Sequence, residues 1–278
     1  MDANRIKIVG IGEGGARAVG KIIAAGFMGK YKNVDFISVG KDENILLSSA
    51  TPNNILLNRD APTIYKSIAA NLRDAKIVIL VAGLGGTAAT GALPRIISFA
   101  KNNNAETIAF ANLPFVLENI ERKKNAEYCL NCLRDVDTAF ILPAEKFFLF
   151  RLYQREISVG ELFEVANEIF SVGAKILVDM TADRKEPLKL GRAAFGYGYG
   201  ATALEAINNA VKFPALDSDE LSQAKKIFVR VTGGNDTPAK NFIRKIIAPD
   251  AKLFWQVDNL RGEKILASIV FNRQEVLK

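Results

Sequence analysis

The sequence feature that most constrains the fold is a short apolar run followed by a segment rich in glycine and threonine. The run Ile77–Val81 is rich in β-branched residues and too short for a typical helix, so it predicts a buried parallel strand. The segment after it reads A-G-L-G-G-T-A-A-T-G-A-L-P from Ala82 to Pro94. Residues 92–100 then predict a helix, with Pro94 tolerated in its first turn.

The same segment indicates a site for an anion. Glycines let backbone N–H groups approach a phosphate closely, and the start of a helix adds the positive end of its dipole. The hydroxyls of Thr87 and Thr90 can donate further hydrogen bonds. A tight turn that binds nothing uses the same residue types, so the segment alone leaves both interpretations open.

Strands and helices alternate through the first half of the chain. The predicted strands are residues 5–9, 34–39, 77–81, 107–111 and 138–142. The predicted helices are residues 45–49, 64–72, 92–100 and 123–133. This alternation predicts an open α/β sheet with its ligands at the carboxyl ends of the strands.

The second half begins with one long predicted helix, residues 158–181, which opens with a capping box formed by Ser158 and Glu161. Tyr197 and Tyr199 then alternate with glycines in a segment that we interpret as a strand-to-helix corner. Beyond it we expect helices at 202–211 and 237–247 and strands at 226–231, 253–257 and 265–271. We therefore predict three parts: an α/β domain at 1–157, the central helix at 158–181, and a smaller α+β domain at 182–278.

Composition excludes several kinds of chemistry. The chain has no histidine, which rules out Ser-His-Asp and Cys-His catalysis and any histidine-bound metal. Cys129 and Cys132 form a single C-x-x-C inside a helical pattern, so we expect buried, unreactive thiols in a reducing compartment and no metal site.

Charge and hydropathy limit which binding partners and which cellular location we expect for the protein. The formal net charge of +7 permits an acidic partner, but lysine and arginine are scattered, so we expect a solvated basic surface and no nucleic acid. The N-terminus lacks the apolar core of a signal peptide, and no apolar run reaches the length of a membrane span. We expect a cytoplasmic protein without a transmembrane segment.

The residues alone support two rival functions. The first is a dinucleotide-dependent oxidoreductase, because Gly10, Gly12 and Gly15 match G-x-G-x-x-G after a strand, with Asp42 or Glu43 for the ribose. The second is a mononucleotide switch that holds phosphates between residues 10–17 and 83–91. The chain lacks G-x-x-x-x-G-K-[ST], so it is not an ordinary P-loop protein.

A series of motifs then occurs in order along the chain. They read G-I-G-E-G-G-A-R at 10–17, A-G-L-G-G-T-A-A-T-G-A-L-P at 82–94, P-F-V-L-E-N-I-E-R at 114–122, A-N-E-I-F-S-V-G-A at 166–174 and G-R-A-A-F-G-Y-G-Y-G at 191–200. The series resembles the FtsZ/tubulin superfamily of GTP-dependent filament proteins, and FtsZ more than tubulin. The second motif is similar to that family's signature A-G-x-G-G-G-T-G-T-G-A-x-P.

The resemblance implies a Rossmann-like parallel-sheet GTPase domain, a long central helix and a smaller α+β C-terminal domain. It implies GTP or GDP as the ligand, with Mg²⁺ as a candidate companion, and a head-to-tail homopolymer as the assembly. The implied binding residues are Gly14, Gly15, Ala16 and Arg17 beside the nucleotide, Gly85, Gly86, Thr87, Ala88, Ala89, Thr90 and Gly91 at the phosphates, Glu118 and Arg122 at the ribose, and Asn167 at the base.

The chain departs from the family pattern in both loops. Glu13 and Arg17 replace a glycine and an asparagine, and Thr87, Ala88 and Ala89 stand where the family has Gly, Thr and Gly. The family's catalytic N-x-D-x-x-D loop has no counterpart, which leaves Asp183 as the candidate catalytic acid.

We therefore expect weak or absent GTP hydrolysis, which leaves open whether the chain is an enzyme. The FtsZ-type C-terminal tail for division adaptors is also expected to be missing. A nucleotide-independent structural homologue is the main alternative, and an NAD-binding oxidoreductase is the weakest of the three.

Overall fold

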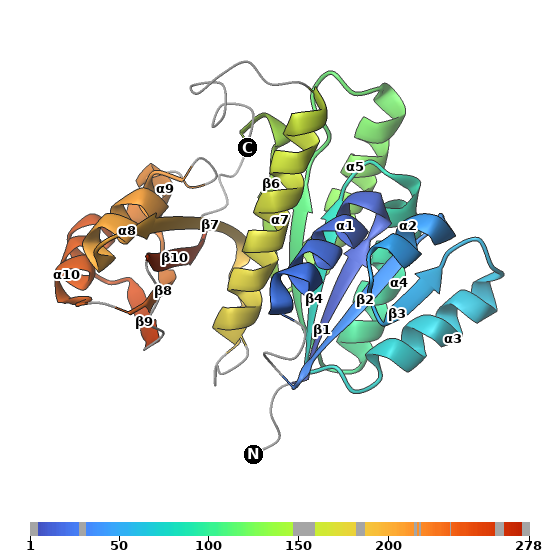
Figure 1. The fold of residues 1–278 in the computed structure, drawn as a ribbon, viewed down its shortest axis with the longest axis horizontal. Coiled ribbons are helices and arrows are strands. Elements are labelled where there is room, and N and C mark those ends of the chain that lie inside the picture. Colours follow the sequence, from blue (N-terminus) through green and yellow to red (C-terminus); the bar gives the residue numbers. More distant parts are fainter. Residues whose placement is uncertain are drawn as a thin grey trace. The chain divides into compact units, whose positions relative to one another are not determined.

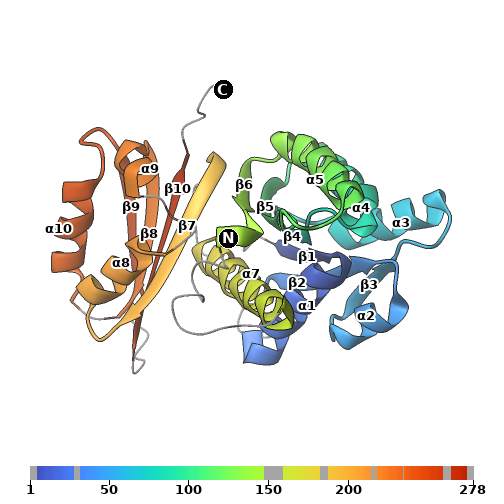
Figure 2. The same ribbon diagram turned by 90° about the horizontal axis from the view of Figure 1, so that it is seen from above.

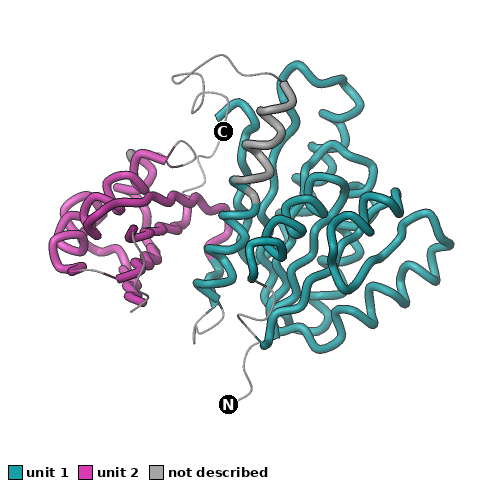
Figure 3. Tube along the Cα trace, viewed as in Figure 1, with its two compact units in different colours: residues 1–189 teal, residues 190–278 magenta. Residues whose placement is uncertain are grey.

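The computed structural model describes residues 5–27, 32–146, 159–181, 187–213, 216, 218–233, 235–258 and 264–273; within 159–181, side chains are described at Ile169 and at 171–181. The chain divides into two compact units, residues 1–189 and 190–278 (Figure 3). The long helix therefore belongs with the first unit. The division into 1–157, 158–181 and 182–278 stays a prediction.

In the first unit, parallel strands form a sheet in the order β3-β2-β1-β4-β5-β6. They are β1 (Ile6–Ile11), β2 (Val34–Gly40), β3 (Asn53–Leu56), β4 (Ile77–Gly83), β5 (Glu106–Asn112) and β6 (Thr138–Leu142). Ile11 of β1 lies opposite Ala82 of β4, so the two central strands end at the same edge. The loops that follow them are thereby brought together.

Helices cover both faces of this sheet (Figures 1 and 2). One face carries α3 (Ala61–Leu72), α4 (Thr87–Asn102) and α5 (Ile120–Cys132), and the other carries α1 (Gly12–Ile22) and α7 (Val159–Thr181). The short α2 (Glu43–Ser48), a π-helical segment (Ile23–Phe27) and a 3-10 turn (Leu133–Asp135) complete the unit.

Alternate residues of a strand point to opposite faces of the sheet. They fill the hydrophobic core on each face, as expected for strands that are buried on both sides. Val78, Leu80 and Ala82 of β4 belong to the cluster that packs against α3, α4 and α5. On the opposite face the ring of Phe110 lies against Gly173 of α7, where an added Cβ would collide with it. The strand Ile77–Gly83 is thus the buried parallel strand that the sequence predicts.

The second unit has the strand order β7-β10-β8-β9, with β10 antiparallel to β7 and β8, and β8 parallel to β9. Its elements are β7 (Gly191–Gly200), α8 (Ala203–Val211), α9 (Ser218–Gln223), β8 (Lys226–Thr232), α10 (Thr237–Ile246), β9 (Lys252–Asp258) and β10 (Ile265–Asn272). The second unit therefore combines a sheet of mixed parallel and antiparallel strands with the helices α8, α9 and α10.

Two local interpretations from the sequence were wrong. Residues 191–200 form one continuous strand rather than a strand-to-helix corner, because the glycines at 196, 198 and 200 let the backbone of α8 lie directly on β7. Helix α4 begins at Thr87, so Pro94 lies in its interior and not in its first turn. The bond that a Pro94 N–H would make to the Thr90 carbonyl is therefore missing.

Two further observations bear on the sequence predictions. Both cysteines are free, with Cys129 buried and Cys132 half-buried. Within the described part of the chain, no helix is long and apolar enough to cross a membrane.

Candidate functional site

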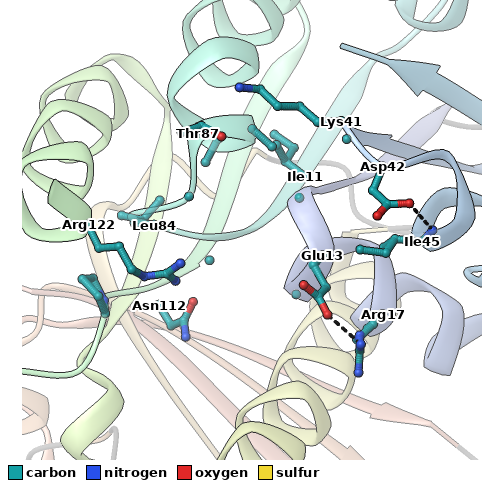
Figure 4. A pocket seen from close by; sticks show the side chains of 18 of the residues that line it. Ile11, Glu13, Arg17, Lys41, Asp42, Ile45, Leu84, Thr87, Asn112 and Arg122 are labelled. Carbon is teal, nitrogen blue, oxygen red and sulfur yellow. Dashed lines mark hydrogen bonds and ion pairs between the residues drawn. The ribbon is translucent and has the colours of Figure 1, made fainter. Parts of the chain in front are cut away.

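A cavity of about 770 Å³ lies at the carboxyl edge of the first unit's sheet. Its walls are residues 11–14 and 17, residues 40–42, 45 and 46, residues 83, 84 and 86–89, and residues 112, 114, 115, 118 and 122. These segments lie at or follow the ends of β1, β2, β4 and β5 (Figure 4). This is where ligands bind in open parallel sheets.

Two helices begin at this cavity without a side-chain cap. The N-cap residues are Ile11 for α1 and Gly86 for α4, and neither provides a side-chain acceptor for the N–H groups of the first turn. By contrast, side chains cap α2, α3, α5 and α8, namely Asp42, Asp60, Asn119 and Thr202. The free N–H groups of α1 and α4, together with both helix dipoles, favour an anion in the cavity.

The segment from the last residue of β4 through the first turn of α4, residues 83–90, is termed the second loop. Gly85 has φ of +107°, a conformation that L side chains rarely adopt, and an added Cβ would lie 2.9 Å from the Arg122 carbonyl oxygen. An added Cβ at Gly86 would meet open space. Thr87 is exposed at the first turn of α4, and its hydroxyl bonds to none of the described residues. The backbone at Gly86 and Thr87 is therefore accessible to a ligand.

The segment from the end of β1 into the first turns of α1, residues 10–17, is termed the first loop. Glu13 Oε1 accepts a hydrogen bond from Arg17 Nη2 at 2.6 Å, and both side chains are more than half exposed (Figure 4). The carboxylate that would repel a phosphate is thus paired with a cation one turn along the helix. The two loops also meet, because an added Cβ at Gly12 would lie 3.6 Å from Ala88 Cβ.

The remaining charged walls come from the ends of β2 and β5. Glu118 forms an ion pair with Arg122, and its Oε1 accepts a hydrogen bond from the Phe115 N–H at 2.7 Å. Lys41 is exposed and makes no ion pair with the described residues. Asn112 Oδ1 is buried without a hydrogen-bond partner in the described part of the chain. The cavity wall therefore offers a free cation and an unsatisfied amide.

Eight of the predicted binding residues line the cavity: Gly14, Arg17, Gly86, Thr87, Ala88, Ala89, Glu118 and Arg122. Five others do not, namely Gly15, Ala16, Gly85, Thr90 and Gly91. Gly15 and Ala16 are buried, and Thr90 Oγ1 donates to the Gly86 carbonyl at 3.1 Å. The side chain of Asn167 and all of Asp183 lie outside the described residues.

Several wall residues were not predicted as nucleotide contacts. Lys41 and Asn112 are examples, and both lie at or directly after the carboxyl end of a strand, which is the signal that could have identified them. Asp42, considered above for a dinucleotide ribose, instead accepts hydrogen bonds from the backbone N–H groups of Asn44 and Ile45. Its role as the cap of α2 weakens the oxidoreductase hypothesis.

Comparison with known proteins identifies the family. Residues 5–150 match the GTPase domain of the tubulin/FtsZ family. Because this match covers more than half of the chain, the chain belongs to that family.

Two relatives found by sequence comparison are named as cell division proteins. The chain is 28% identical to FtsZ of Bartonella bacilliformis, over 94% of this chain and 50% of that protein. It is also 28% identical to FtsZ 1 of Thermococcus kodakarensis, over 96% of this chain and 80% of that protein. The chain spans about half the length of the first of these relatives.

Solved structures confirm the predicted FtsZ/tubulin fold. The empty FtsZ dimer of M. jannaschii has a TM-score of 0.80 at 22% identity, covering 100% of this chain and 94% of that one. The GTPγS-bound CetZ2 protofilament of Haloferax volcanii has a TM-score of 0.75 at 17% identity, covering 98% and 94%. At these identities the likeness concerns the fold.

Proposed function

We propose that the chain binds a guanine nucleotide in the cavity of the first unit. The observation that carries this proposal is the pair of uncapped helices, α1 and α4, that begin side by side at one cavity. Their free N–H groups and dipoles suit a phosphate chain. The cavity volume of about 770 Å³ lies within the range for small-molecule sites.

Different parts of the cavity wall would contact different parts of the nucleotide. The phosphates would lie at Gly14, Gly86 and Thr87, with Lys41 as a mobile cation for the terminal phosphate. Glu118 and Arg122 would hold the ribose, and Asn167 would read the base. The carboxylates of Glu13, Asp42 and Glu118 are each engaged with another protein group, so we assign none of them to Mg²⁺.

The altered second loop is compatible with this proposal. Ala89 is buried in the core cluster behind the loop, so its methyl group is accommodated by the protein. Ala88 is half-buried at the contact between the two loops. Among the departures from the family pattern, Ala88 is therefore expected to reduce nucleotide affinity the most. We expect weakened rather than abolished binding.

Base selection is tested by Asn167→Ala. An amide can accept a hydrogen bond from guanine N1–H and donate to O6, a pairing that adenine does not offer. We expect the variant to lose most of the preference for GTP over ATP, at a cost of about 1–3 kcal/mol for the unpaired polar group. Calorimetric titration with both nucleotides measures the preference, and an unchanged ratio would exclude Asn167 as the base reader.

We further propose head-to-tail assembly, in which the cavity face of one subunit meets the second unit of the next. Such a heterologous contact does not close, so it propagates as a filament. Relatives of this fold have been solved as a dimer and as a protofilament. We expect filaments by electron microscopy when GTP is present. Equal assembly in every nucleotide state would favour the nucleotide-independent homologue, whereas a strict monomer under all conditions would refute assembly.

We propose that GTP turnover is slow. Phosphoryl transfer depends on positioning a water molecule and stabilising charge, and the chain lacks the family's acidic loop. Asp183 is followed directly by Arg184 and Lys185, which would pair with it. Phosphate release from assembled protein should be slow and unchanged in Asp183→Ala. Brisk turnover that this substitution abolishes would make Asp183 the catalytic acid.

A further inference from the structure

Helix α5 packs against the second loop. Arg122, Asn125 and Cys129 lie three and four residues apart, so they share one face of the helix. Asn125 Nδ2 donates to the Gly85 carbonyl oxygen at 3.1 Å. The backbone and Cβ of Arg122 lie beneath Gly85, and Cys129 Sγ lies 3.9 Å from Thr90 Oγ1. One face of α5 therefore contacts both ends of the loop.

The hydrogen bond from Asn125 fixes the orientation of a particular peptide group. The Gly85 carbonyl and the Gly86 N–H belong to the same planar trans peptide, so they point in opposite directions. Because the carbonyl is held toward α5, the N–H points away from α5. Gly86 lines the cavity, and its N–H makes no hydrogen bond to the described residues. Without this hydrogen bond the peptide could rotate, because its rotation changes ψ of Gly85 and φ of Gly86, and glycine permits a wide range of both.

We propose that Asn125 is a positioning residue that aims the Gly86 N–H at the phosphates of the bound nucleotide without touching the nucleotide itself. Asn125 is half-buried and is not part of the cavity wall. The inference rests on the proposed nucleotide site. Helix α5 would then contribute to both the phosphate and the ribose parts of the site. Arg122, which is proposed to hold the ribose, lies one turn before Asn125 on this helix.

The matched pair of variants is Asn125→Leu and Asn131→Leu. Both replace asparagine by leucine on α5, but Asn131 is exposed, and its side chain makes no hydrogen bond to residues 83–90, all of which the structure describes. We expect GTP affinity to fall about tenfold in Asn125→Leu, as for loss of one oriented donor, and to stay within about twofold of wild type in Asn131→Leu. Thermal unfolding of both variants shows whether each one folds.

A double-mutant cycle separates positioning from a general structural effect. Gly86→Ala places a methyl group at the peptide that Asn125 is proposed to orient. If Asn125 acts through that peptide, Asn125→Leu should cost little further affinity in the Gly86→Ala background. Fully additive losses would overturn the inference.

The failures of this inference and of the proposed function are distinguishable. If wild type binds GTP and Asn125→Leu binds it equally well, the inference is wrong and the site stands. If wild type binds no nucleotide, the proposed function fails, and hydrogen exchange of residues 84–90 then tests only whether Asn125 holds the loop in place. Faster exchange in Asn125→Leu than in Asn131→Leu would support it, and equal exchange would overturn it.

Discussion

The two glycine-rich loops look alike in the sequence, but Gly10 and Gly15 of the first pack against backbone, whereas Gly86 of the second borders open space. In the first loop, an added Cβ at Gly10 or Gly15 would collide with backbone atoms of the neighbouring segments, including the Val81 carbonyl oxygen. Those glycines let α1 pack closely on β1 and β4. In the second loop, an added Cβ at Gly85 would lie 2.9 Å from the Arg122 carbonyl oxygen, whereas one at Gly86 would meet open space. There the glycine at Gly86 leaves backbone exposed to the cavity.

Glycines in such loops meet two separate physical requirements. One is close packing of helix on strand, which any tight α/β turn needs. The other is close approach of a ligand to the backbone, which only a binding loop needs. The sequence cannot separate them, because both remove the same Cβ. Substitution by alanine separates them experimentally.

The largest effect is expected for Gly15→Ala. The new methyl group has no space beside the Val81 carbonyl oxygen, so α1 must shift away from the sheet. We expect the free energy of unfolding to fall by about 3 kcal/mol, at the upper end of the range for overpacked cores. Urea denaturation followed by circular dichroism measures it. A loss below about 0.5 kcal/mol would show that the first loop is not held by packing.

The next effect is expected for Gly86→Ala, with Gly91→Ala as its control. Gly86 lines the cavity and has φ of −81°, so alanine fits the backbone but its methyl group enters the space above the start of α4. We expect stability to change by less than about 1 kcal/mol and GTP affinity to fall about tenfold.

Gly91 is exposed inside α4 and does not line the cavity. Alanine there should leave GTP affinity unchanged and raise stability by about 0.5–1 kcal/mol, since alanine favours helix. Calorimetry and denaturation together distinguish the two sites. Equal losses of affinity in both variants would contradict the assignment of Gly86 to the ligand face.

Much of the first unit could be predicted because its strands are strongly apolar and its helices are periodic. β4 was found from five residues, and β6 matches its predicted bounds. β3 was missed, because Asn53 and Asn54 resemble a turn and only Ile55 is buried in that strand. β7 was misread because its glycines reflect the proximity of α8, a tertiary contact that no local pattern records.

The site was predicted in part for a similar reason. Residues whose role follows from chain position, such as Gly86 and Thr87, do line the cavity. Thr90 was assigned to the same face, but it lies one helical turn further on, and its hydroxyl bonds back to Gly86. Lys41 was not assigned, since a single lysine after a strand carries no motif. Spacing in the sequence therefore does not show which side chains of a helix face the cavity.

The smallest effects are expected for the charge pair of the first loop. Both side chains are more than half exposed, so water and salt screen them. Glu13→Gln should strengthen GTP binding about two- to threefold, and Arg17→Gln should weaken it by a similar factor, because the unpaired Glu13 carboxylate then repels the phosphates. The difference should shrink at high salt. Changes of the same sign in both variants would contradict this pairing.

The central claim is that two uncapped helix starts at one cavity form a guanine nucleotide site. Calorimetric titration of the unaltered chain with GTP, GDP, ATP and NAD tests it most directly. We expect saturable binding of GTP and GDP, with ATP bound at least about tenfold more weakly and NAD not bound. Equal affinity for GTP and ATP, or binding of NAD alone, would contradict it.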